Sequence, residues 1–231
     1  MSIKFNLKKI VLGFIALIFS ILFLAFLLIL NPNGSTHESQ REKHVFAQFT
    51  PDLSQLPDLQ KFQARDNDWL SYRYYPSYAK ATAGGPSSSD NVIILLHGSN
   101  AQGEYLNNLA RFLSENNIGK VYVPNLRGHY LSGRHRGDCE YIGQIEDDIV
   151  DLINKFENNN KNIFLLGHSL GGGLAIRFAG SKYNNLIKGY VLLTPAIPNS
   201  PVLKNSNAGG WANFYKLRNY GLMIFNLLGI T

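Results

Sequence analysis

The sequence predicts an α/β fold, in which helices cover both faces of a mostly parallel sheet, preceded by one N-terminal transmembrane helix. Two observations support this prediction. Beyond residue 90, short apolar runs without alternation, typical of strands buried on both faces, take turns with amphipathic helical stretches. Near the N-terminus, residues 10–30 form an uncharged apolar run, and about 20 such residues suffice to cross a ~30 Å hydrocarbon core.

Composition is that of a folded chain, with 231 residues, 45% hydrophobic and 16% charged. The net charge is +6, and the six basic residues after Leu170 are scattered singly, so no nucleic-acid partner is expected. Cys139 is the single cysteine, which excludes an internal disulfide, and a structural thiol is the favoured interpretation. No metal site and no cofactor are predicted.

Charge around the apolar run predicts its orientation. Lys4, Lys8 and Lys9 precede the run, whereas the first Arg or Lys after it is Arg41. By the positive-inside rule, residues 1–9 are cytoplasmic, residues 10–30 are the anchor and the rest of the chain is extracytoplasmic.

A cleaved signal peptide, with secretion of the rest, is the alternative to a single-pass anchor. Its apolar core is typically shorter and ends in a small-residue cleavage site. The exit Leu30-Asn31-Pro32-Asn33 has no such site, and no cysteine for acylation follows. An uncleaved anchor is therefore favoured.

The next elements are a linker and a hairpin. Residues 31–58 are polar, contain three prolines and read as a linker in which His37 and His44 are solvated. The β-prone runs 59–62 and 69–75, separated by Asp66-Asn67-Asp68, predict a hairpin of edge strands. Residues 83–89 are predicted to form a loop, and it has no lysine that would suggest a phosphate loop.

The core alternates between strands and helices. Strands are predicted over 92–96, 121–123, 163–166 and 190–193, and helices over 103–115, 141–156 and 170–179. The helix over 141–156 has its carboxylates opposite its apolar stripe, which predicts a solvated face rather than a metal or acid/base site; they are Glu146, Asp147, Asp148 and Asp151.

Each of the first three core strands ends in a motif: His97-Gly98-Ser99, Asn125-Leu126-Arg127-Gly128-His129, and Gly167-His168-Ser169-Leu170-Gly171-Gly172. The third is a Gly-x-Ser-x-Gly pattern on a strand-to-helix turn. Together these motifs resemble the α/β-hydrolase superfamily, in particular its esterase, lysophospholipase and monoacylglycerol-lipase-like branches. The resemblance covers Val92 to Ala196 and implies an α/β-hydrolase core over residues 59–196 that holds the first six strands.

The resemblance makes Ser169 the nucleophile. Gly167 and Gly171 flank it because the turn strains the backbone and brings strand and helix close together. The helix that begins at Leu170 directs its N-terminal amides to a developing oxyanion. The resemblance assigns the oxyanion hole to the backbone N–H groups of Leu170 and Ser99.

The remaining motif residues are expected to support the site. His97 and Gly98 would order the oxyanion loop, and Arg127, Gly128 and His129 the loop after the second strand. The residue before the nucleophile points away from such a site, so packing is expected of His168, and Gly172 belongs to the close helix start. Residues 134–136, Arg-His-Arg, are expected to form a solvated basic loop.

The sequence contains no Asp, Glu or His after Leu170, whereas the family's catalytic acid and histidine follow later strands. Residues 197–231 accordingly resemble the start of a cap or a truncated remainder. We expect an unpaired hydrophobic edge at the last strand and an uncovered apolar segment over 222–230. The missing acid and histidine would come from a second polypeptide or from a reading frame that continues beyond Thr231.

Three functional hypotheses follow. The first is a membrane-anchored serine hydrolase that cleaves carboxyl esters, lipid-like or otherwise hydrophobic, through an acyl-serine intermediate, with this chain truncated and weak or inactive alone. The second is a non-catalytic remnant or binding module. The third is a Ser–His dyad in which His129 or His97 is a relocated base. The identity of the substrate stays open.

Overall fold

The computed structural model describes residues 7–30, 52–77, 80–82, 85–87, 89–99, 101–157, 159, 162–197 and 216–229. The chain forms two compact units. One comprises Met1–Gln48 with Lys204–Thr231, and the other comprises Phe49–Leu203. Most of the predicted linker and of the predicted C-terminal segment lie outside the described residues, and so do His37 and His44.

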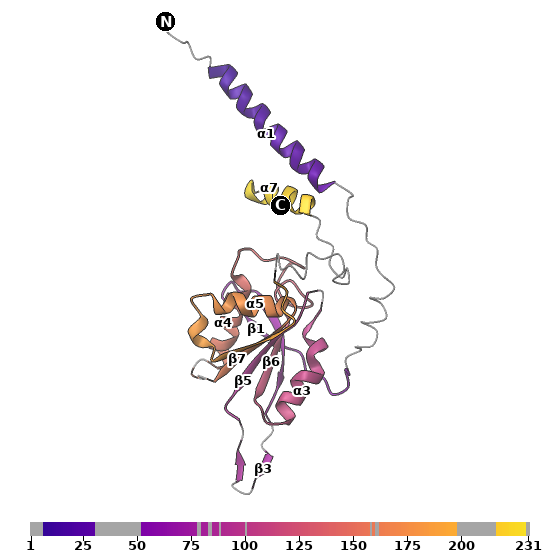
Figure 1. The fold of residues 1–231 in the computed structure, drawn as a ribbon, viewed down its shortest axis with the longest axis vertical. Helices are drawn as coiled ribbons and strands as arrows, with labels where there is room; N and C mark the ends of the chain where they lie inside the picture. The colour runs from indigo at the N-terminus through magenta and orange to yellow at the C-terminus, as the bar shows by residue number, and fades with distance from the viewer. Residues whose placement is uncertain are drawn as a thin grey trace. The chain divides into compact units, whose positions relative to one another are not determined.

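Two helices make up the described part of the first unit (Figure 1). α1 (Leu7–Ile29) contains the stretch Val11–Ile29, whose mean hydropathy of 3.0 and length suffice to cross a membrane. The predicted helix over residues 10–30 is therefore observed, and it ends one residue early. α7 (Lys216–Leu227) lies within the apolar segment that the sequence places at the C-terminal end, and it packs against α1.

The second unit is built on a six-stranded sheet in the order β1-β2-β6-β5-β7-β8. β1 (Gln60–Gln63) and β2 (Trp69–Tyr75) form the predicted hairpin, and β2 runs antiparallel to β6 (Lys120–Pro124). The strands β6, β5 (Val92–Leu96), β7 (Ile163–His168) and β8 (Gly189–Leu193) are parallel. The prediction of a mostly parallel sheet with six strands is confirmed.

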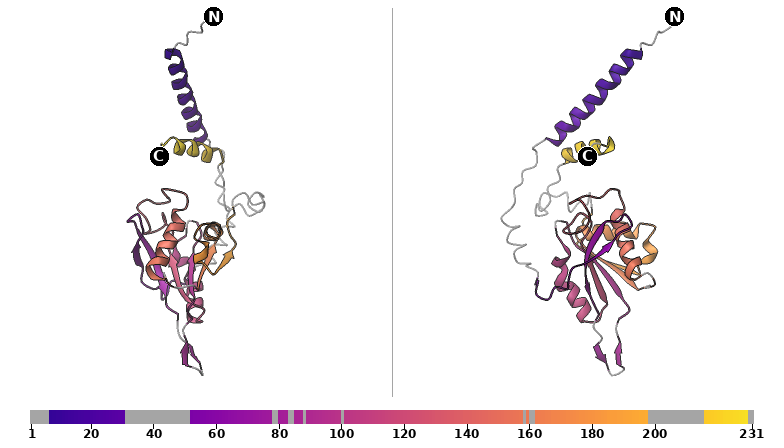
Figure 2. Two further views of the ribbon diagram at one scale, coloured as in Figure 1. Left: turned by 90° about the vertical axis from the view of Figure 1, so that its left-hand side faces the viewer. Right: turned by 180° about the vertical axis from the view of Figure 1, so that it is seen from behind.

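Helices cover both faces of this sheet, as predicted (Figure 2). On one face, η1 (Gly103–Leu106) and α3 (Asn107–Glu115) pack on Ile93 and Leu95. On the other, α4 (Gln144–Phe156) and α5 (Leu170–Ala179) pack on Ile94 and Leu96. Successive residues of β5 thus enter opposite cores, which explains why this strand is apolar without alternation. A short turn of helix, η2 (Asn184–Leu186), precedes β8.

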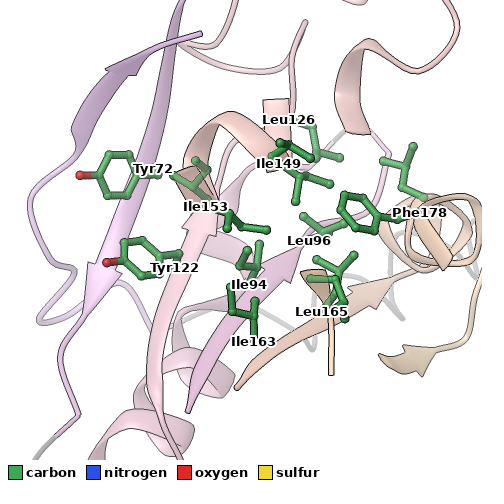
Figure 3. Close-up of a cluster of buried hydrophobic side chains, with 14 of the residues drawn as sticks. Tyr72, Ile94, Leu96, Tyr122, Leu126, Ile149, Ile153, Ile163, Leu165 and Phe178 are labelled. Atoms are coloured by element: carbon green, nitrogen blue, oxygen red, sulfur yellow. The ribbon is translucent and has the colours of Figure 1, made fainter. Parts of the chain in front are cut away.

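The larger core lies between the sheet and the pair α4 and α5 (Figure 3). Phe178 of α5 is fully buried there beside strand residues such as Leu165. Toward the β1–β2 edge, the core becomes aromatic: the ring of Tyr72 lies 5.2 Å from that of Phe156, and Phe156 stacks on Tyr122 at 5.8 Å. Tyr72 of the hairpin therefore packs in this aromatic part of the core.

Three predicted boundaries need correction. The first turn of the helix predicted over 103–115 is a 3₁₀ turn, and the helix predicted from residue 141 begins at Gln144. Gly143, with φ 107°, is in a left-handed conformation that ends the preceding loop. The loop predicted over 83–89 includes β4 (Gly85–Ser87), which pairs with β3 (Lys80–Thr82); strands of three residues are too short to give a periodic signal.

The prediction of a solvated acidic face on α4 is wrong. Glu146 and Asp148 are only 5% and 7% exposed. Glu146 pairs with Arg177, whereas Asp147 and Asp151 both pair with Arg65. The periodicity of α4 identifies its apolar stripe, but the cations that cover its other side come from distant parts of the chain.

β8 is an edge strand among the strands that the structure describes, because it pairs only with β7. Val191 and Leu192 are 43% and 42% exposed. The expected hydrophobic edge at the last strand is therefore present.

Phe178→Ala is expected to lower the free energy of unfolding by about 3–5 kcal/mol, because it leaves a cavity in a closed core. Urea denaturation of the full chain in detergent, followed by near-UV circular dichroism, measures the loss. Phe112→Ala is the matched control, since Phe112 is 57% exposed, and it should change stability by less than about 0.5 kcal/mol. Equal losses in the two variants would contradict this description of the core.

Candidate active site

The three sequence motifs meet at the carboxyl ends of the strands, because β5, β6 and β7 are parallel and end at the same level of the sheet. Leu96 at the end of β5 is in register with Gly167 of β7, so the two loops that follow lie side by side. A Cβ atom on Gly98 would lie 3.3 Å from Cβ of Ser169. The first and third motifs therefore form one surface, as their order along the chain predicts.

Ser169 occupies a strained backbone conformation, with φ 52° and ψ −114°, between β7 and α5. Such a conformation costs on the order of 1–3 kcal/mol in a non-glycine residue. Backbone hydrogen bonds hold it: the Ser169 N–H donates to the Leu193 carbonyl at 3.0 Å, and the Ser169 carbonyl accepts from the N–H of Ala196 at 2.8 Å and of Gly173 at 3.1 Å. The serine is thus clamped between β8 and the first turn of α5.

Two glycines of the turn leave no room for a side chain. A Cβ on Gly167 would lie 2.1 Å from the carbonyl oxygen of Gly171, and a Cβ on Gly171 would lie 2.4 Å from that of Leu96. Both separations are far below van der Waals contact. The Gly-x-Ser-x-Gly spacing is therefore a packing requirement here, as the sequence analysis expects.

The two predicted oxyanion donors are the residue that follows Ser169 and the residue that follows Gly98. Leu170 is the first residue of α5, so its N–H has no partner within the helix. Ser99 directly follows Gly98, and its side chain is exposed. Among the described residues, neither N–H donates a backbone hydrogen bond.

His97 is completely buried, and both of its ring nitrogens are engaged. Its Nε2 accepts a hydrogen bond from the Leu126 N–H at 3.0 Å, so the proton is on Nδ1, which donates to the Gly98 carbonyl at 2.8 Å. Burial lowers the pKa of His97 to about 4. A neutral histidine with two occupied nitrogens joins the β5 and β6 loops and has no lone pair for Ser169.

The other two histidines near the site have different surroundings. His129 is half-buried, its Nδ1 lies 3.1 Å from the Arg127 carbonyl oxygen, and its ring is 5.0 Å from that of His97. His168 packs against Tyr105 at 5.6 Å, and desolvation lowers its pKa. Within the described part of the chain, the buried Nδ1 of His168 has no hydrogen-bond partner. These contacts match the packing role expected of His168.

Arg127 is the centre of a buried ionic cluster that the sequence analysis missed. Its guanidinium bonds to Asp148 through two nitrogens at 2.9 and 2.7 Å, and to Asp68 and Asp66 at 2.8 and 2.9 Å. Arg134 also pairs with Asp68. The cluster connects the loop after β6 to the β1–β2 turn and to α4. Through these ion pairs Arg127 orders the loop, as expected.

Gly128 supports the same loop. Its φ of 76° is left-handed, and a Cβ there would lie 2.8 Å from the backbone nitrogens of Gly137 and Asp138. The only sequence signal for the cluster is the Asp66-Asn67-Asp68 turn, which by itself is an ordinary hairpin turn. No group of three or more His, Cys, Asp or Glu residues suited to a metal ion is present among the described residues.

Gly171→Ala is expected to lower the free energy of unfolding by at least about 2 kcal/mol, because the new methyl group must push β5 away from α5. Gly180→Ala is the matched control, since a Cβ there meets its nearest atom at an ordinary 3.6 Å. Urea denaturation of both variants measures the difference. The interpretation fails if Gly171→Ala is as stable as Gly180→Ala.

The buried neutral His97 predicts a pH dependence of stability. Its pKa falls from an ordinary 6.5 to about 4 on folding, so between these pH values the unfolded chain binds more protons and stability decreases as the pH falls. The decrease should be up to about 3 kcal/mol larger in wild type than in His97→Gln. Denaturation curves of the two proteins at pH 7 and pH 4.5 measure this difference. Asp148, whose pKa burial raises to about 6, contributes with the opposite sign in both proteins and cancels.

Comparisons with known proteins agree with this geometry. The family model of serine aminopeptidase, S33, matches residues 87–217, which is more than half of the chain. Phospholipase YtpA of Bacillus subtilis is 30% identical over 107 residues, covering 46% of this chain and 40% of its own. Human monoglyceride lipase is 27% identical over 157 residues, covering 66% of this chain and 48% of its own.

The α/β hydrolase GrgF from Penicillium sp. sh18 has a similar fold, with a TM-score of 0.53 and 18% identity over 75% of this chain and 67% of that one. The chain spans less than half the length of the curated relatives described above. Fold and sequence agree, and the chain belongs to the serine aminopeptidase S33 family of the α/β-hydrolase superfamily.

Proposed function

We propose that the chain carries the nucleophile and the oxyanion hole of a membrane-anchored serine hydrolase that cleaves carboxyl esters through an acyl-serine intermediate. One observation carries the proposal: Ser169 is held at positive φ between β7 and α5, with the Gly98–Ser99 backbone beside it. A strained backbone conformation persists only where the surrounding structure fixes it, and strained residues cluster at functional sites.

The proposed reaction begins with attack by Oγ of Ser169 on the carbonyl carbon of the ester. The hydroxyl proton leaves to a general base, and the carbonyl oxygen becomes an oxyanion that accepts hydrogen bonds from the N–H groups of Leu170 and Ser99. One such donor is commonly worth about 3 kcal/mol of transition-state stabilisation. Collapse expels the alcohol, which takes up a proton, and water then hydrolyses the acyl-Ser169 ester.

The proposed reaction needs a general base, and this chain has no histidine or carboxylate after Leu170, where the family has its catalytic acid and histidine. His97 has no free nitrogen, and the sequence has no Asp, Glu or His after Leu170. A serine hydroxyl without a base stays protonated and is a weak nucleophile. We therefore propose no acid–histidine pair among these residues, and we expect slow acylation by the chain alone.

The substrate is proposed to be a lipid-like or otherwise hydrophobic ester. Two relatives are named for lipid substrates, a phospholipase and a monoglyceride lipase. The apolar helix α1 also favours a lipid-like substrate, because a membrane anchor would keep the hydrolase close to a bilayer. Lys4, Lys8 and Lys9 precede the apolar stretch Val11–Ile29, so by the positive-inside rule we propose a cytoplasmic N-terminus and an extracytoplasmic hydrolase unit.

A non-catalytic binding module is the second candidate. The specific observation in its favour is the occupied state of His97 together with the absence of an acid and a histidine after Leu170. In this case the Ser169 turn would have a structural role and would not turn over a substrate.

A fluorophosphonate probe distinguishes the two candidates, because it reacts with an activated serine and the adduct stays bound. We expect slow labelling of the full chain that disappears in Ser169→Ala. Ser181→Ala is the control, since Ser181 lies beyond α5, and it should label like wild type. Absence of labelling in wild type, or labelling that survives Ser169→Ala, favours the binding module.

Two substitutions at position 99, one without a backbone N–H and one with it, test the role of the Ser99 N–H. Ser99→Pro has no N–H, and labelling should slow by about 10²–10³-fold. Ser99→Ala keeps the N–H, and it should label at nearly the wild-type rate. Equal rates in the two variants would exclude this N–H as an oxyanion donor, and far-UV circular dichroism checks that both are folded.

A further inference from the structure

α7 meets α1 through a contact between two small residues. Gly221 lies so close to α1 that a Cβ on it would be 2.6 Å from the carbonyl oxygen of Ala25 and 2.8 Å from the side chain of Ile29. Ala25 is completely buried, whereas its neighbours on α1 such as Phe26 and Leu27 are each 48% exposed. Small residues allow two helices to approach closely, and this is a frequent form of helix contact in membranes.

The contact lies at the C-terminal end of α1, where the stretch long enough to span a membrane finishes at Ile29. Figures 1 and 2 show α7 crossing α1 near this end instead of running alongside it. If α1 spans a bilayer, the end of the span is the polar interface of the membrane. α7 is therefore positioned at the depth of the lipid head groups.

α7 has an apolar stripe, which we define as Tyr220, Met223 and Leu227. The spacing i, i+3, i+7 places the three residues on one side of the helix. They are 56%, 58% and 79% exposed, so neither α1 nor any other described residue covers them. Arg218 is exposed, and helical spacing places it on the side of the helix opposite the stripe.

The charge of α7 suits an anionic lipid surface. Its sequence includes Lys216 and Arg218, and the chain has no acidic residue after Leu170. A helix that exposes apolar side chains on one side and carries basic residues can lie in the plane of a membrane interface, with the apolar side chains among the acyl chains and the long basic side chains reaching the head groups. Lipid that covers the exposed Phe26 and Leu27 of α1 would be continuous with lipid that covers the stripe.

We propose that α7 is an interfacial membrane helix: it lies along the surface of an anionic bilayer, packed through Gly221 on the end of α1, with the stripe in the lipid. The proposal rests on the anchor role of α1 in the proposed function. It gives the hydrolase unit a membrane attachment at both of its ends, because residues 1–48 and 204–231 belong to the same compact unit.

Site-directed fluorescence tests the proposal in the full chain. Single cysteines are placed in a Cys139→Ser background at Leu17 in α1, at Met223 in the stripe, at Leu222 as the neighbouring control off the stripe, and at Lys182 in the hydrolase unit. Each is labelled with an environment-sensitive fluorophore and reconstituted in vesicles of phosphatidylcholine and phosphatidylglycerol. Nitroxide lipids quench from the head-group region or from deep in the acyl chains.

We expect the Leu17 probe to be quenched most by the deep nitroxide and the Met223 probe most by the head-group nitroxide. Quenching at Met223 should exceed that at Leu222 several-fold, and the Lys182 probe should not be quenched. Replacing Gly221 by Leu should reduce quenching at Met223 and leave that at Leu17 unchanged, because it separates α7 from α1.

The outcomes separate the two proposals. A Leu17 probe that no lipid quenches contradicts the anchor, and with it the membrane part of the proposed function. Quenching at Leu17 with none at Met223 above that at Leu222 overturns the interfacial helix alone. Disulfide-linked dimers through a cysteine at Met223, without lipid quenching there, would show that a second copy covers the stripe and would also overturn it.

Discussion

The positive φ of Ser169 depends on how closely β7, α5 and β5 approach one another, and the rest of the site depends on that serine. The approach is possible because Gly167 and Gly171 have no side chains, and the end of β5 fills the space that a methyl group would need. Once β5 is fixed in this way, Gly98 lies beside Ser169, and the buried His97 joins the same loop to Leu126. One steric constraint thus positions Ser169, the proposed nucleophile, and the neighbouring backbone together.

A second, electrostatic constraint holds the loop after β6. Arg127 is buried, and a buried charge is stable only when it is paired and hydrogen-bonded. Three aspartates from the β1–β2 turn and α4 satisfy it. The antiparallel hairpin at the start of the hydrolase unit therefore does more than extend the sheet, because its turn supplies two of the three carboxylates that fix the loop beside His97.

Local pattern in the sequence predicts the elements and the Ser169 turn, because strand burial, helical periodicity and the Gly-x-Ser-x-Gly spacing act over a few residues. Long-range pairing is not predictable in this way. Periodicity does not identify Asp66, Asp68 and Asp148 as partners of Arg127, and it predicts a solvated acidic side on α4 because the cations that pair with this side lie far away in the chain. The packing of α7 on α1 includes a close approach of Gly221 to Ala25 and Ile29, which periodicity does not reveal.

We propose that Ser169 is a nucleophile held beside two oxyanion donors and that the residues of this chain do not supply its base. Rescue by imidazole, a base in solution, tests this proposal, with release of p-nitrophenol from p-nitrophenyl butyrate as the measurement. Imidazole is expected to accelerate release by the full chain beyond the release seen with Ser169→Ala, which corrects for direct catalysis by imidazole. Identical rates for wild type and Ser169→Ala at every imidazole concentration would contradict it.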